Sequence, residues 1–194
     1  MSYIGTKPAD AVLRTQDISD GIVTNPKLST GSQQNFRNIV INGDMSIAQR
    51  GTSASSITSS GGYETIDRYN LQLDTAGTWT QSQSTDVPTG QGFAKSLKMD
   101  CTTANSSLSA GSLMYINQRF EGQNLQYIKK GTSSAESLTL SFWVKSNKTG
   151  TYIVQFLDTD NSRSNSQSYT ISSADTWEKK TITFAGDTSG VLNN

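Results

Sequence analysis

The chain has 194 residues, and its 16 Lys and Arg balance its 16 Asp and Glu, so the formal net charge is zero. The sequence therefore lacks the basic field that binds nucleic acid, and no apolar run approaches the roughly 20 residues that span a bilayer. Histidine is absent and there is one cysteine, which excludes an intrachain disulfide and His-based triads and argues against the common zinc sites.

Hydrophobic residues make up 33% of the chain and charged residues 16%, and both fractions are below the usual values. Low charge argues against ordinary disorder, which normally needs high net charge. The composition instead fits a β protein with wide polar surfaces. Neutral polar surfaces also suit contact with identical subunits, because they add no like-charge repulsion.

Residues 1–35 are predicted to form an extended attachment arm and linker. Their apolar side chains are sparse and lie among turn formers, with neither helical nor strand periodicity. Such a segment cannot offset the entropy of its own ordering, so it folds against another chain or remains a flexible leader. The side chains expected to contact other chains are Tyr3, Ile4, Val12, Leu13, Ile18, Ile22, Val23 and Leu28.

The next segments alternate between strand and turn patterns. Residues 38–44 predict a short strand that ends in a Gly-Asp turn, and residues 51–62, rich in Ser, Thr and Gly, predict a long exposed loop. Two separate strands are expected next, over residues 66–73 and residues 79–84. In the first of them Tyr69, Leu71 and Leu73 share one face.

Residues 96–101 predict a strand that places Leu97, Met99 and Cys101 on one face. The cysteine is interpreted as a buried thiol that acts as a small hydrophobe. A further strand is expected over residues 113–120.

Residues 121–131 are the one helical candidate, with Leu125 and Ile128 three apart and Gly131 as a cap.

The strongest strand pattern covers residues 137–146 and alternates apolar with polar side chains, so that Leu138, Leu140, Phe142 and Val144 share one face. Residues 151–158 are expected to complete a hairpin with it. Residues 158–165 predict a polar loop, whose Asp-Thr-Asp-Asn run is a plain turn because the glycine and distal glutamate of a calcium loop are missing. Strands over residues 167–171 and 177–184 follow.

This run of short strands and turns predicts an all-β fold, namely an antiparallel, jelly-roll-like β-sandwich over residues 36–194 preceded by the extended arm. No closing strand is evident after residue 185, which would leave an exposed sheet edge. We therefore expect the sequence to be a fragment of a longer chain.

Several of these segments resemble a known family. Residues 1–5, MSYIG, through residues 20–28, DGIVTNPKL, are similar to the N-terminal leader of phage tail-fibre proteins, particularly those of marine podovirus-like phages, in which DGxVT..KL units recur. Residues 38–51, NIVINGDMSIAQRG, resemble the opening of the following fibre domain. Residues 117–124 and 138–146 also match, and resemble carbohydrate-binding-module sandwiches.

The resemblance implies a structural virion protein, the tail-proximal part of a homotrimeric tail fibre. Its arm would dock on phage tail adaptor or nozzle proteins, and the fibre would support viral attachment to the host cell. We expect no cofactor, no metal, no enzymatic activity, no nucleic-acid partner and no membrane insertion. Paired carboxylates are the remaining route to glycoside hydrolysis, but no spacing in the sequence singles out two of them.

The alternative function is that of a carbohydrate-binding module that contacts host surface polysaccharide directly. Trp79, Trp143 and Trp177 are the candidates for stacking on sugar rings or for contact with a neighbouring subunit. Trp143 is the best of them, because the other face of its strand carries the apolar residues. Arg50, Arg68 and Arg119 are candidates for interchain ion pairs, although solvated surface arginines are the more usual outcome.

Overall fold

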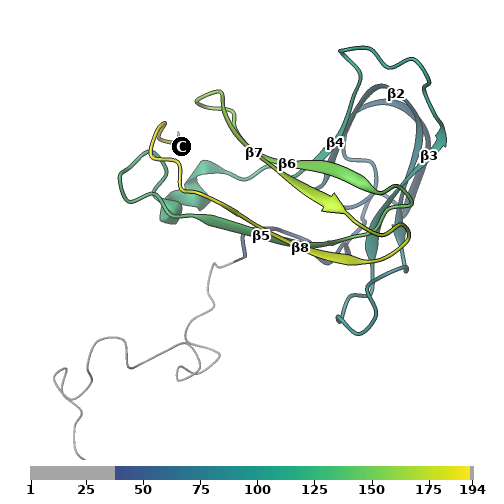
Figure 1. Ribbon diagram of the computed structural model, residues 1–194, viewed down its shortest axis with the longest axis horizontal. Helices are drawn as coiled ribbons and strands as arrows, with labels where there is room; N and C mark the ends of the chain where they lie inside the picture. Colours follow the sequence, from purple (N-terminus) through teal and green to yellow (C-terminus); the bar gives the residue numbers. More distant parts are fainter. Residues whose placement is uncertain (1–37, 193–194) are drawn as a thin grey trace, which may run out of the picture. The chain divides into compact units, whose positions relative to one another are not determined.

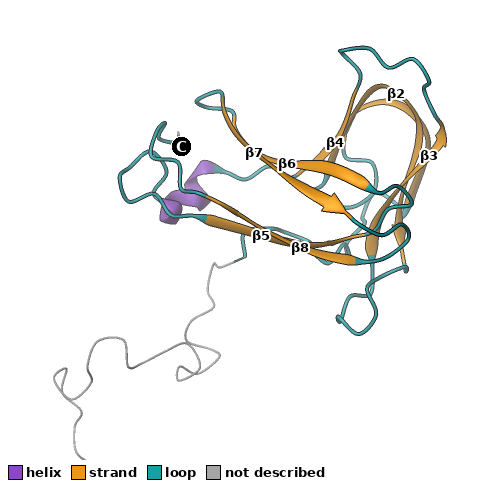
Figure 2. Ribbon diagram, in the orientation of Figure 1, coloured by secondary structure: helices purple, strands orange, loops and turns teal. Residues whose placement is uncertain are grey.

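The computed structural model describes residues 38–192, and the chain divides into two units, Met1–Ile39 and Val40–Asn194. The described part of the second unit contains eight β-strands and one short 3-10 helix, and every strand pairing in it is antiparallel (Figures 1 and 2). The predicted all-β class is confirmed.

The first sheet is built around one long strand, β2 (Asn70–Ser84). Strand β1 (Ser53–Gly62) pairs with one edge of β2. The other edge is shared by β4 (Leu113–Asn117), which pairs with the first third of β2, and β3 (Ser96–Thr103), which pairs with the last half. Strand β2 therefore changes partner along its length.

A bend in the middle of β2 makes this change of partner possible. Thr75 and Gly77 have φ angles of 49° and 95°, outside the range of a regular strand. A Cβ atom on Gly77 would lie 2.6 Å from the Thr103 carbonyl oxygen, so only glycine fits there. The prediction of two separate strands was wrong, because β2 runs through this bend as one strand (Figure 1).

The predicted loop at residues 51–62 was also wrong, because most of it is strand β1. Its Ser and Thr side chains are largely exposed, and Ile57 is its one buried residue. A strand held mainly by backbone pairing leaves little hydrophobic pattern to detect.

The core of the first sheet consists of Ile57, Leu71 and Leu73, which confirms the predicted face of Leu71 and Leu73. Partly buried side chains pack against these three residues, namely Ala54, Ala76, Trp79, Met99, Met114 and Ile116. Cys101, predicted to be buried, is exposed. The last four residues of β3 are all exposed, so the thiol lies beyond the covered part of the strand.

Residues 41–49 form a segment that we call the strap, and a turn replaces the strand predicted at residues 38–44. Asn42 adopts a φ of 56°, which Asn tolerates better than most residues. Its side-chain amide donates to the carbonyl oxygens of Ile47 (2.9 Å) and Asp67 (3.0 Å), and its Oδ1 accepts from the Ile47 N–H. These local bonds compete with strand pairing.

Two glutamines of the first sheet region hold the rest of the strap. Gln83 donates from Nε2 to the carbonyl oxygens of Met45 (2.7 Å) and Ser46 (3.0 Å). Gln118 and the backbone of Ile41 exchange two hydrogen bonds of 2.8 Å each. The strap is thus joined to the strand β2 and to the segment after β4 by side-chain amides.

Two two-stranded ribbons make up the rest of the fold. Strand β5 (Leu138–Val144) pairs with β8 (Glu178–Phe184), and β6 (Gly150–Asp158) pairs with β7 (Arg163–Ile171). The predicted hairpin between residues 137–146 and 151–158 was therefore wrong. These two strands belong to different ribbons, which face each other (Figure 1).

Aromatic side chains form the contact between the two ribbons. Phe142 meets Tyr169 edge-on with ring centroids 5.1 Å apart, and Phe156 meets Phe184 edge-on at 4.4 Å. Within the β6–β7 ribbon, Tyr152 stacks on its cross-strand partner Tyr169 at 5.7 Å. Such pairs contribute about 0.5–1.5 kcal/mol each beyond burial of their area. Because the paired strands form three separate sheets, the jelly-roll topology stays a prediction.

The predicted helix at residues 121–131 is present as the 3-10 helix η3 (Gly122–Ile128), in which Ile128 is buried. Its C-cap is Lys129, with a φ of 51°, in place of Gly131. Helix η3 leads directly into the polar cluster that fixes the end of the described chain.

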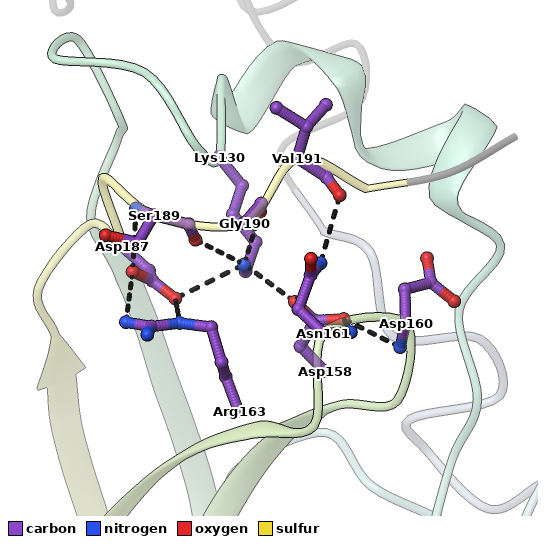
Figure 3. A network of polar contacts seen from close by, with 9 residues as sticks. All are labelled: Lys130, Asp158, Asp160, Asn161, Arg163, Asp187, Ser189, Gly190 and Val191. Carbon is purple, nitrogen blue, oxygen red and sulfur yellow. Dashed lines mark hydrogen bonds and ion pairs between the residues drawn. The ribbon is translucent and has the colours of Figure 1, made fainter.

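That polar cluster, the lysine clasp, is centred on Lys130 (Figure 3). The Lys130 Nζ lies 2.7 Å from Asp158 Oδ2 and 3.2 Å from Asp187 Oδ2, and donates to the carbonyl oxygens of Ser189 (2.9 Å) and Gly190 (2.6 Å). The side chains of Lys130 and Asp158 are only 11% and 8% exposed. The ammonium therefore connects the end of β6 to the segment after β8.

Arg163 completes the clasp with two 2.8 Å hydrogen bonds to the two oxygens of Asp187. These bonds, with further donors from Ser189 and Lys130, hold the pKa of Asp187 far below its usual range. Burial alone would raise the pKa of Asp158, but hydrogen bonds from Lys130 and Asn161 outweigh it and lower that pKa. Both carboxylates are thus stabilised in their charged form.

Candidate functional site

Two of the three tryptophans share one face of the β5–β8 ribbon. Trp143 lies on β5 directly opposite Lys179 of β8, and Trp177 immediately precedes β8. Side chains alternate between faces along a strand, so Trp143, Lys145, Trp177 and Lys179 lie on the face opposite to Phe142. We call this group the tryptophan face.

The indole of Trp177 is held in place by a residue far away in the sequence. Its Nε1 donates to Asp86 Oδ1 at 2.9 Å, and the other Asp86 oxygen pairs with Lys145 Nζ. The Lys145 ammonium also lies 5.6 Å from the centroid of the Trp177 ring, within cation–π range. Trp177 is therefore oriented before any ligand or partner arrives.

Electrostatics at this face depend on Asp86, in the connection between β2 and β3. Hydrogen bonds from Lys145 and Trp177 lower the pKa of the Asp86 carboxyl. The face thus presents two partly exposed indole rings beside two ammonium groups and one carboxylate. Flat apolar rings beside charged hydrogen-bonding groups suit contact with the C–H face and hydroxyls of a sugar, or with a protein surface.

Trp79 does not join the other two. It lies on β2, packs against Ile57, Leu71 and Leu73, and donates from Nε1 to the Ala76 carbonyl oxygen at 2.8 Å. Its indole nitrogen is satisfied within its own strand, so this tryptophan belongs to the core of the first sheet.

The contact residues predicted in the arm lie outside the described residues, and their roles stay predictions. They are Tyr3, Ile4, Val12, Leu13, Ile18, Ile22, Val23 and Leu28. The strap begins six residues after residue 35 and is the described segment that the arm leads into.

Sequence reasoning missed the parts played by Asp86 and Lys145 at the tryptophan face. The bond between Asp86 and Trp177 spans 91 residues, and no local pattern reports such a contact. The alternation of β5 did place Lys145 on the same face as Trp143, which was the available signal. The lysine clasp was missed for the same reason, since its members come from four separate segments.

Within residues 38–192, no group of three or more acidic or cysteine side chains is arranged to hold a metal ion. In the same part of the chain, no helix has the length and apolar character needed to cross a membrane. Comparison with known proteins gives no match to any family model, curated protein or solved structure.

Proposed function

We propose that this chain is the tail-proximal part of a trimeric phage tail fibre, in which residues 1–35 attach the β-sheet unit to the tail. The observation that carries the proposal is the joint resemblance of residues 1–28 and 38–51 to a fibre leader and to the opening of a fibre domain. A neutral chain with polar surfaces also suits close packing of identical subunits.

The strap supports this proposal on mechanical grounds. A segment that connects a docking arm to a folded unit must transmit any load between them. Asn42, Gln83 and Gln118 together make seven hydrogen bonds that fasten residues 41–47, and each contributes on the order of 1 kcal/mol. Load on the arm would therefore reach the first sheet through many bonds at once.

The test is deletion of residues 1–28 in the particle whose genome encodes the chain. The truncated protein is expected to keep the circular dichroism spectrum of its β unit and to be absent from assembled tails. A matched control replaces Ser29, Thr30 and Ser32 of the linker with alanine and should leave incorporation unchanged. Truncated protein at normal copy number in purified particles would contradict the anchoring role.

A second candidate function is glycan binding at the tryptophan face. The observation that favours it is the placement of Trp143 and the pre-oriented Trp177 on one face with Asp86, Lys145 and Lys179. Trp143→Ala should abolish weak binding on a glycan array, while Tyr115→Ala, which removes a half-exposed ring on β4, should not. Equal binding by both variants, or no binding by the unmodified protein, would count against this function.

A further inference from the structure

A concave site lies away from the tryptophan face, where the strap meets the turn before β2. It is a pocket of 340 Å³ lined by Gln49, Arg50, Tyr63, Asp67 and Arg68. We call it the arginine pocket. Two guanidinium groups and one carboxylate give its lining a net charge of +1.

The turn that carries Asp67 and Arg68 is rigidly anchored. The two residues before it, Thr65 and Ile66, are fully buried. Both the backbone N–H (3.0 Å) and the hydroxyl (2.7 Å) of Thr65 donate to Oε1 of the buried Gln81. The position of the pocket floor is therefore set by the core of the first sheet.

Asp67 is fixed on three sides by the strap. Its N–H donates to the Ile47 carbonyl oxygen (3.0 Å), its carbonyl oxygen accepts from Asn42, and its Oδ1 accepts from the Gln49 N–H (3.1 Å). A carboxylate held this way is a pre-organised acceptor, which lowers the entropic cost of binding a ligand.

In the part of the chain that the structure describes, the contacts of the two guanidinium groups leave most of their hydrogen-bonding capacity unused. Within residues 38–192, Arg50 contacts the Asp67 carboxylate at 3.8 Å and the Tyr63 ring at 5.4 Å from its centroid, and neither contact is a hydrogen bond of ordinary length. Arg68 makes one long bond of 3.4 Å to the Arg119 carbonyl oxygen. Arg68 also has a φ of 75°, an uncommon conformation for a non-glycine residue.

We infer that the arginine pocket binds the carboxylate of an acidic sugar, such as a hexuronic acid. The guanidinium groups of Arg50 and Arg68 take the carboxylate in charge-assisted hydrogen bonds. Asp67 accepts from the ring hydroxyls, and Tyr63 supplies an apolar surface beside them. A simple anion would use the arginines and offer Asp67 no hydroxyl donor, whereas a neutral sugar would leave the arginines unused.

This inference does not depend on the chain being part of a fibre, and it uses none of the residues of the tryptophan face. The experiment is calorimetric titration of the full chain with methyl glucuronide, compared with methyl glucoside, acetate and inorganic phosphate. Methyl glucuronide should bind with a Kd on the order of 1 mM, and each of the other three about tenfold more weakly.

Variants then assign the binding to this pocket. Arg50→Met and Arg68→Gln should each weaken methyl glucuronide binding about tenfold while leaving the midpoint of urea unfolding unchanged. Lys148→Gln removes the same charge from an exposed turn between β5 and β6, and Trp143→Ala alters the tryptophan face, so both should bind as the unmodified chain does.

Three results would overturn the inference. They are the absence of saturable glucuronide binding, equal affinity for acetate or phosphate, and equal loss of binding in Lys148→Gln and Arg50→Met. None of these results bears on whether residues 1–35 anchor the chain to a tail.

Discussion

Gly186 lies where the segment after β8 passes against the residues that lead into β5. A Cβ atom at this position would lie 2.2 Å from the Ala135 carbonyl oxygen and 3.0 Å from that of Glu136. Both contacts are with backbone atoms, which cannot rotate away as a side chain can. Gly186 is therefore required by close approach of two backbone segments.

Gly186→Ala should lower the free energy of unfolding by about 1–3 kcal/mol, because the backbone must shift to admit the methyl group. Gly111→Ala is the matched control, since the nearest atom to its added Cβ is a serine hydroxyl at 3.9 Å, and it should change the free energy by less than about 0.5 kcal/mol. Urea unfolding with an unchanged m value measures both. Equal midpoints for the two variants would refute the steric argument.

Individual residues show what a sequence pattern reports and what it omits. Alternation correctly placed Leu71 and Leu73 in the core, because the period of a strand decides which face a side chain takes. It failed for Cys101, since alternation does not say how far along a strand the covering layer extends. It was silent on Asp86, whose bond to Trp177 joins distant parts of the chain.

At the level of elements, the pattern of a strand was easier to predict than its partner. Strand β5 has a strong apolar alternation and was found where expected, yet it pairs with β8 and not with β6. Pairing depends on contacts between distant segments, such as the aromatic contacts between the two ribbons, which strand periodicity does not report. Strand β1 shows the opposite failure. Backbone hydrogen bonds to β2 hold this strand, and its mostly polar side chains give no apolar alternation from which the strand could be predicted.

The lysine clasp connects elements that no sheet joins, and Lys130 is its centre. Lys130→Met would leave the buried Asp158 carboxylate without its ammonium partner, and should lower the free energy of unfolding by about 3 kcal/mol. Lys129→Met is the neighbouring control, because its ion pair with Glu136 is half exposed on both sides and such pairs contribute about 0–1 kcal/mol. Urea unfolding would reveal the difference, and equal effects would show that the clasp does not stabilise the fold.

The clasp also predicts a loss of stability in acid. The pKa values of Asp158 and Asp187 are lower in the folded protein than the usual value near 3.9. As the pH falls below about 5, the unfolded chain takes up these protons first, so the free energy of unfolding decreases with falling pH. Stability measured by urea unfolding between about pH 7 and pH 3 should show this decline.

The acid response also distinguishes the clasp from general charge effects. Lys130→Met removes the ammonium that lowers the pKa of Asp158, so the decline with falling pH should be shallower in this variant than in Lys129→Met. Identical slopes for the two variants would mean that other carboxylates are responsible for the acid sensitivity.

At the scale of the whole chain, we propose that residues 1–35 are a docking arm and that the β unit is the part this arm attaches to the tail. The sequence predicted the all-β class because alternation and turn residues are local signals. It did not predict three separate sheets, since the number of sheets depends on contacts between distant segments. The predicted arm over residues 1–35 lies outside the described residues, and its role stays a prediction.

Residues 1–35 are proposed to anchor this unit to a tail in three copies, and cryo-electron microscopy of the particle whose genome encodes the chain is the decisive test. We expect density for the unit of residues 40–192 in groups of three beside the tail, with residues 1–35 lying against tail proteins. Density for the unit at the distal end of a fibre, or particles that lack the chain altogether, would contradict it.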